Sequence, residues 1–237
     1  FGRGWEPLPL DDETARCTGT APDQRPGETG WEGRTTLPYP PIEVPEEPTV
    51  GDLSIAAGAV YGSPLGDAFV LELAERAVAE LELGADDVTD ALMISLSSCD
   101  TVGHSFGPTS RETTDVLLRA DRGLARLFAL LDERVGRGRW IASLSADHGV
   151  LDLREALVER GVHAVRVPLE RVAEDLARVR ALLEQEFGHD FVLGYDGASL
   201  RLSAAGMAAA GADAAAVRAR AAELLASEAG EWVEATF

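Results

Sequence analysis

Two helix-like and two strand-like patterns alternate in the middle of the chain. Residues 67–84 carry apolar side chains at intervals of three and four, which predicts a helix that begins near Asp67. The apolar run ALMISLS at 91–97 predicts a buried strand. A second helical period covers 116–136, and WIASLS at 140–145 predicts another strand. This order of strand, loop, helix and strand implies a βαβ unit with a parallel sheet.

Turn and cap residues punctuate these segments. Gly84 and Gly136 are placed to end the two helices, and TSRE at 109–112 fits a capping box that starts the second one. Nine of the twelve prolines lie in residues 1–50, which show neither helical nor strand period and predict an extended connection. Trp5 and Trp31 indicate that this connection covers a core, because disordered tails contain few aromatic residues.

The pattern changes after residue 150. It predicts two helices, a hairpin that turns at Asp196-Gly197, a further helix and a last strand, over residues 153–161, 169–188, 191–203, 214–230 and 232–237. We therefore expect three parts: a Pro-rich connection at 1–50, an α/β core at 51–150, and a small inserted α+β subdomain at 151–237.

Composition excludes some partners. The formal net charge is −20, and every basic residue is an arginine, which argues against binding to a nucleic-acid backbone or an anionic membrane surface. No apolar run is long enough to span a membrane, and no secretory signal is visible. Cys17 and Cys99 are too few for a disulfide framework. Oligomeric state and the redox state of the two cysteines stay open.

Candidate chemistry lies where the two predicted strands end. SSCDTVGHSFGP contains Asp100 and His104, and SLSADHGV contains Asp147 and His148. Ligand sites of open parallel sheets lie at the carboxyl ends of the strands, so the two loops could meet. Carboxylate and imidazole suit Zn²⁺, and this set could serve one ion or be divided between two.

Either pair alone would more often be a turn cap and a hydrogen-bonded core histidine, and only their joint context favours a metal site. The glycine beside each histidine, Gly103 and Gly149, would let backbone approach the site closely. His163 and His189 lack a comparable setting and receive no metal role. Cys99 fits a buried small residue better than a ligand, because in an extended segment it would point away from Asp100.

These residues carry a resemblance. The stretch SLSSCDTVGHSFGPTSRETTD, the helix after it and SLSADHGV resemble the metal-binding core of the alkaline phosphatase superfamily, in the branch of bacterial alkaline phosphatase family proteins and type I phosphodiesterases/nucleotide pyrophosphatases. YDGASLRL and WVEATF extend the likeness into the subdomain. The resemblance implies an alkaline-phosphatase-like α/β core, with Asp100 and His104 as ligands of one Zn²⁺ and Asp147 and His148 as ligands of the other. It also implies hydrolysis of small-molecule phosphate esters through a Thr or Ser phosphoenzyme, and a periplasmic or extracellular location.

The chain departs from that family pattern. The strand that ends in a metal-ligating Asp, the Thr/Ser nucleophile, the Asn and Lys-x-Arg that contact phosphate, and a late His ligand are all missing. We therefore expect an internal piece of a longer enzyme that is inactive alone, with no catalytic residue in this chain. Thr18 and Thr20 have no accompanying base that would make them substitute nucleophiles.

Other interpretations stay open. A non-catalytic pseudo-phosphatase could have kept a residual cation site, and a sulfatase or a cofactor-independent phosphoglycerate mutase would share the superfamily. The G-H-x-x-G-P continuation fits these last two less well. Monoester and diester substrates are both compatible with the residues present.

Overall fold

The computed structural model describes residues 2, 4–20, 22–30, 34–196 and 199–230. The chain divides into two units, Phe1–Ala164 and Val165–Phe237. The division lies beyond the expected boundary at residue 150, because residues after 150 contact the N-terminal segment. The guanidinium of Arg25 lies 3.6 Å from the carboxylate of Asp152. Helix α6 (Arg154–Glu159) follows directly and belongs to the first unit.

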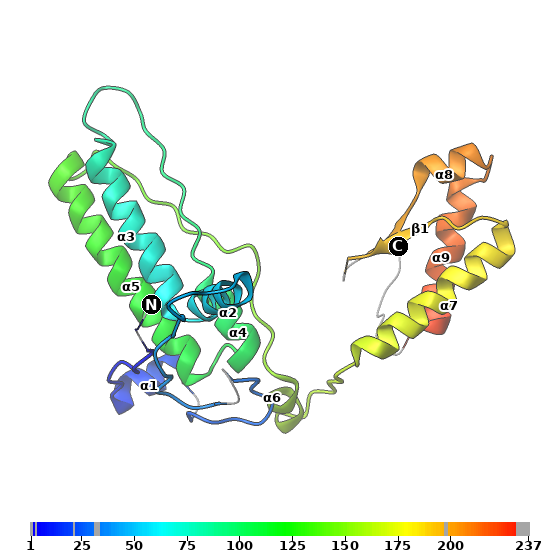
Figure 1. The fold of residues 1–237 in the computed structure, drawn as a ribbon, viewed down its shortest axis with the longest axis horizontal. Coiled ribbons are helices and arrows are strands. Elements are labelled where there is room, and N and C mark those ends of the chain that lie inside the picture. Colours follow the sequence, from blue (N-terminus) through cyan, green and yellow to red (C-terminus); the bar gives the residue numbers. More distant parts are fainter. Residues whose placement is uncertain (1, 3, 21, 31–33, 197–198, 231–237) are drawn as a thin grey trace. The chain divides into compact units, whose positions relative to one another are not determined.

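Two long helices form the centre of the first unit. Helices α3 (Pro64–Glu80) and α5 (Arg111–Leu131) lie side by side (Figure 1) and bury a shared cluster of Leu71, Ala74, Val78 and Leu127. Helix α3 begins earlier than predicted: Ser63 is its N-cap, whereas Asp67 lies buried in its first turn. Helix α5 continues as a π-helical turn, η1 (Asp132–Gly136), and ends at the predicted glycine, whose φ is 104°.

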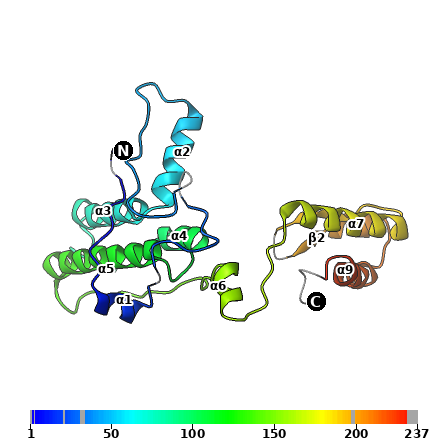
Figure 2. The same ribbon diagram turned by 90° about the horizontal axis from the view of Figure 1, so that it is seen from below.

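The N-terminal segment supplies a second cluster. Trp5 and Tyr39 pair in an isolated antiparallel bridge and pack on Val102, Phe106 and Val116, so Trp5 covers a core as predicted. Trp31 lies outside the described residues. The segment is not wholly extended, however. It contains helix α1 (Asp12–Thr18), and α2 (Val50–Tyr61) follows it (Figure 2).

The predicted capping box at the start of α5 is wrong by one residue. Ser110, rather than Thr109, is the N-cap, and its hydroxyl accepts the backbone N–H of Thr113. Glu112 turns inward instead, where the hydroxyl of Tyr39 donates to its Oε1 at 2.9 Å. Glu112 is fully buried and its Oε2 has no hydrogen-bond partner. Burial raises the pKa of this carboxyl to about 7.

The two predicted parallel strands are not paired. Among the described residues the sheet consists of two strands, both in the second unit. Residues 91–97 and 140–145 form no β-strand hydrogen bonds. Ile94 and Leu96 pack on the cluster between α3 and α5, but other apolar side chains of these segments are uncovered: Met93 is 96% exposed, Ile141 97% and Leu144 84%. A strand forms only against a partner, because its backbone N–H and C=O groups need one.

The second unit follows the predicted α+β pattern. Helices α7 (Leu169–Phe187) and α9 (Ala214–Glu228) bury Val179, Leu183, Ala221 and Leu224 between them. Strands β1 (Val192–Tyr195) and β2 (Leu200–Leu202) form the antiparallel hairpin, and the unpredicted α8 (Ala204–Ala209) follows. The turn residue Gly197 and the expected strand at 232–237 lie outside the described residues. No helix in the described ranges is both long and apolar enough to cross a membrane.

Candidate metal centre

The first Asp/His pair lies on a helix rather than in the expected loop. Helix α4 (Ser98–Phe106) carries Asp100 in its first turn and His104 in its last. Positions i and i+4 share one face of a helix, and the Nε2 of His104 lies 3.4 Å from the Oδ1 of Asp100. The opposite face buries Val102 and Phe106 in the aromatic cluster. The buried face therefore anchors the helix, and the two polar side chains lie on its exposed face.

Residues 147–150 approach α4 closely. A Cβ on Gly103 would lie 3.2 Å from the Cγ1 of Val150, so glycine at this position permits the contact. Gly149, by contrast, has open space around it. Next to Val150, the Nε2 of His148 lies 4.0 Å from the Oδ1 of Asp100 and 3.6 Å from the Oδ2 of Asp147. The structure thus places His148 beside Asp100, while Asp147, whose side chain is 88% exposed, lies beside its neighbour His148.

The tautomer of His148 leaves one ring nitrogen available. Its Nδ1 lies 2.9 Å from the carbonyl oxygen of Gly149, and because a carbonyl only accepts, Nδ1 must donate. Nε2 then faces Asp100 as a potential ligand, which is how metal-binding imidazoles are usually oriented. The same hydrogen bond, followed by the carboxylates of Asp147 and Asp100, raises the pKa of His148.

Carboxylate and imidazole are ligand types that zinc accepts, and the spacing of one pair can be compared with that of zinc ligands. Donors on neighbouring corners of a tetrahedral Zn²⁺ lie roughly 3.3 Å apart, close to the 3.4 Å between His104 and Asp100. The Oδ1 of Asp100 is buried and has no hydrogen-bond partner; the Nε2 atoms of His104 and His148 lie 3.4 and 4.0 Å from it. Within the described ranges, no group of three or more His, Cys, Asp and Glu side chains is placed so that it could hold a metal ion. The candidate residues are arranged as two neighbouring Asp/His pairs.

The other candidate residues lie elsewhere or are engaged. Cys99 packs half-buried against the aromatic cluster, and burial raises its pKa, which keeps it a protonated thiol. The hydroxyl of Thr18 donates to the Thr14 carbonyl, and that of Thr20 shares a 2.7 Å hydrogen bond with Thr114. Neither contact activates a nucleophile.

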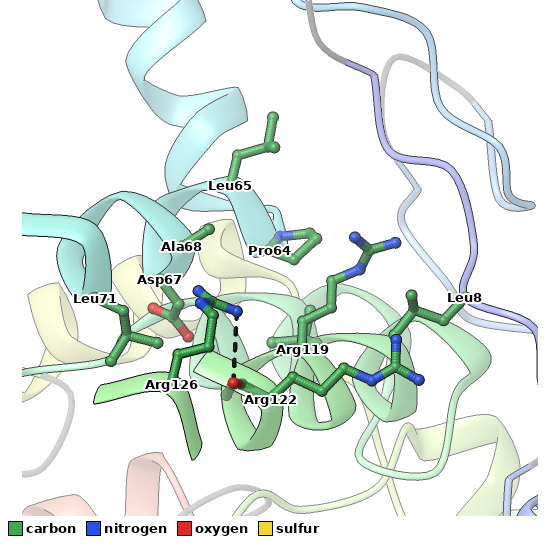
Figure 3. Close-up of a pocket in the computed structure, with 11 residues that line it drawn as sticks. Leu8, Pro64, Leu65, Asp67, Ala68, Leu71, Arg119, Arg122 and Arg126 are labelled. Atoms are coloured by element: carbon green, nitrogen blue, oxygen red, sulfur yellow. Dashed lines mark hydrogen bonds between the residues drawn. The ribbon is translucent and has the colours of Figure 1, made fainter. Parts of the chain in front are cut away.

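A cavity of about 240 Å³ lies between the first turn of α3 and the middle of α5 (Figure 3). Three arginines of α5 line it, but two are paired: Arg119 lies 2.6 Å from Asp115 and Arg126 lies 3.5 Å from Glu75. None of the four candidate ligands lines this cavity. It is separate from the candidate metal centre.

Asp67 contacts α4 in a way that the sequence did not predict. This buried side chain of α3 accepts hydrogen bonds from the first backbone N–H groups of α4. Its position near the start of α3 suggested only a local cap. Nothing local in the sequence shows that it reaches a helix some thirty residues away.

Comparison with known proteins identifies the family of the chain. Residues 31–228 match the family described as type I phosphodiesterase / nucleotide pyrophosphatase. The chain is 36% identical over 170 residues to alkaline phosphatase PafA of Elizabethkingia meningoseptica, which covers 69% of this chain and 29% of that protein. It is 35% identical over 150 residues to alkaline phosphatase PhoV of Synechococcus elongatus, covering 63% of this chain and 26% of PhoV.

The fold agrees as well. The crystal structure of wild-type PafA superposes with a TM-score of 0.74 at 28% identity, over 94% of this chain and 40% of that one. This confirms the expected alkaline-phosphatase-like core, which is incomplete here because the chain spans less than a third of the length of the curated relatives it matches. The chain belongs to the type I phosphodiesterase / nucleotide pyrophosphatase family of the alkaline phosphatase superfamily.

Proposed function

We propose that this chain is an internal part of a zinc-dependent phosphate-ester hydrolase. In the whole enzyme, Asp100 and His104 would hold one Zn²⁺, and Asp147 and His148 a second. The observation that carries the proposal is that the two pairs are neighbours: the Nε2 atoms of His104 and His148 lie 3.4 and 4.0 Å from the same oxygen of Asp100. Family membership supports the reaction class. By the same likeness we propose an exported, periplasmic or extracellular enzyme.

The residues of this chain would contribute binding and orientation. Bound zinc would supply positive charge that polarises the oxygens of a phosphate ester. The hydrogen bond from His148 Nδ1 to the Gly149 carbonyl would fix the orientation of the imidazole, so that Nε2 is the nitrogen left to bind a metal. We propose that a Thr or Ser outside this chain forms the phosphoenzyme, because Thr18 and Thr20 have no activating partner here.

The exposed apolar side chains of residues 91–97 and 140–145 support the proposal of a longer enzyme. Met93, Ile141 and Leu144 lie on runs whose pattern predicts buried strands, yet each is more than four-fifths exposed. Neighbouring strands from further chain would cover these side chains and pair their backbone. They would also bring the remaining ligands, since two protein ligands hold an ion more weakly than a closed set of four.

Metal titration tests the proposal. Isothermal titration of the 237-residue chain with Zn²⁺ should show binding that His148→Ala weakens at least tenfold, as expected for loss of a ligand. His163→Ala is the matched control, because His163 lies in the same unit without an acidic partner, and it should bind as the wild type does. Equal binding by all three proteins would contradict the assignment.

Activity measurements test the second half of the proposal. With excess Zn²⁺ and an aryl phosphate, the isolated chain should show little or no turnover. Robust turnover that His148→Ala abolishes would show that the nucleophile lies within this chain. Zinc binding with no turnover in a protein extended at both ends would instead favour the non-catalytic binding module.

A further inference from the structure

Helix α4, which carries Asp100 and His104, begins without a cap of its own. Its N-cap residue, Ser97, has a helical backbone with φ −109° and ψ −10° and makes no side-chain capping hydrogen bond. The first N–H groups of a helix have no partner within the helix. Ser98 is buried, so water cannot readily take that role. The partner must come from another element.

Asp67 of α3 is that partner. Its Oδ1 accepts the backbone N–H groups of Ser97 and Ser98, both at 3.0 Å. In return, the backbone N–H of Asp67 donates to the hydroxyl of Ser98 at 3.2 Å. A Cβ on the preceding residue, Gly66, would lie 3.0 Å from that hydroxyl, so glycine permits the close approach. The three hydrogen bonds form a reciprocal clamp between α3 and α4.

Capping α4 in this way carries a free-energy cost, because it buries a carboxylate. Asp67 is 4% exposed, and its second oxygen, Oδ2, is buried without a hydrogen-bond partner. A buried carboxylate is costly unless it is fully paired, and the positive end of α4 offsets only part of that cost. If Ser97 had the extended backbone of a normal N-cap, its own hydroxyl could accept a free N–H group of α4 without burying a charge. An unsatisfied buried group of this kind calls for a role beyond capping.

The place of the clamp suggests that role. It holds residues 97 and 98, two to three residues before Asp100 and nearly two helical turns before His104. We propose that Asp67 is a positioning residue, which sets the axial position of α4 and so holds the Asp100/His104 pair in place beside His148. The inference rests on the proposed function.

Two substitutions at Asp67 and one elsewhere test it. Asp67→Ala removes the acceptor of both N–H groups, whereas Asp67→Asn keeps a carbonyl oxygen that can accept them. Asp52→Ala is the matched control: Asp52 completes the capping box of α2, and it is not a candidate ligand. Isothermal titration with Zn²⁺ should show a tenfold to hundredfold weaker affinity for Asp67→Ala, about wild-type affinity for Asp67→Asn, and wild-type affinity for Asp52→Ala.

Amide hydrogen exchange of the metal-free proteins gives the second readout. Asp67→Ala should speed the exchange of α4 amides at least tenfold, and Asp52→Ala should affect only those of α2. Wild-type zinc affinity or unchanged α4 exchange in Asp67→Ala would overturn the inference, as would equal losses of affinity in Asp67→Ala and Asp52→Ala. If the wild type binds no Zn²⁺, the proposed function fails, while α4 exchange still decides whether Asp67 holds the helix.

Discussion

The buried carboxyl of Glu112 should make the stability of the first unit fall as the pH rises. Its pKa lies at about 7 in the folded protein, above the usual 4.5, because burial disfavours the charged form. The folded state therefore binds this proton more tightly than the unfolded state between those two values. The free energy of unfolding therefore begins to fall at about pH 4.5, where the unfolded state loses the proton. The fall is complete above pH 7, where the folded state has lost it as well.

The size of the effect follows from the shift. A rise from 4.5 to about 7 corresponds to a cost of about 3 kcal/mol at pH 8, at 1.4 kcal/mol per unit. Glu112→Gln removes the ionisation, while its amide oxygen can still accept the hydroxyl of Tyr39. We expect the variant to be more stable than the wild type by about 1–3 kcal/mol at pH 8, and by only about 1 kcal/mol or less at pH 5, where Glu112 is neutral in the folded state.

Equilibrium urea unfolding measures this difference. Tryptophan fluorescence is a suitable probe, since Trp5 packs on Tyr39 with ring centroids 5.4 Å apart, and a chelator excludes effects of bound metal. Glu72→Gln, on an exposed position of α3, removes the same charge and controls for the net charge of −20. A Glu112→Gln difference that is the same at pH 5 and pH 8, or a less stable variant at pH 8, would refute the reasoning.

Three other variants probe packing and the candidate site. Trp5→Phe should lower the free energy of unfolding in urea by about 1–3 kcal/mol, because it removes the 2.8 Å hydrogen bond from Nε1 to the buried Asp115. Trp140→Phe should lower it less, because the partner of Trp140, Asp132, is partly exposed. Gly123→Ala should destabilise by about 1–3 kcal/mol, since its Cβ would lie 2.4 Å from Leu71, whereas Gly58→Ala in open space should stabilise by about 0.5–1 kcal/mol. Gly103→Ala should push Val150 away from α4 and lower the Zn²⁺ affinity in isothermal titration, while Gly58→Ala should leave that affinity unchanged.

Local periodicity predicted the elements that are stabilised by their own apolar face. Helices α3, α5, α7 and α9 each bury one stripe, and the β1–β2 hairpin follows the alternation around Asp196. The short α1 buries no residue and α2 buries only Ala56, so neither has a stripe to detect. The predicted N-cap of α5 was wrong because two candidate residues, Thr109 and Ser110, are adjacent. Local sequence does not show that Glu112 bonds to Tyr39 in the core instead of completing a capping box.

The four candidate ligands could be predicted from the sequence, but not the way in which they meet. The prediction relied on parallel strands that end at one edge of a sheet, and those strands are unpaired here. The side chains still converge, because Gly103 lets Val150 pack on α4 and Asp67 holds the start of that helix. Contacts between α4 and its neighbours can therefore set the spacing of Asp100, His104 and His148 before any sheet forms. It follows that strand pairing in a longer protein would add ligands and exclude water, while the geometry of the Asp100 pair depends on α3.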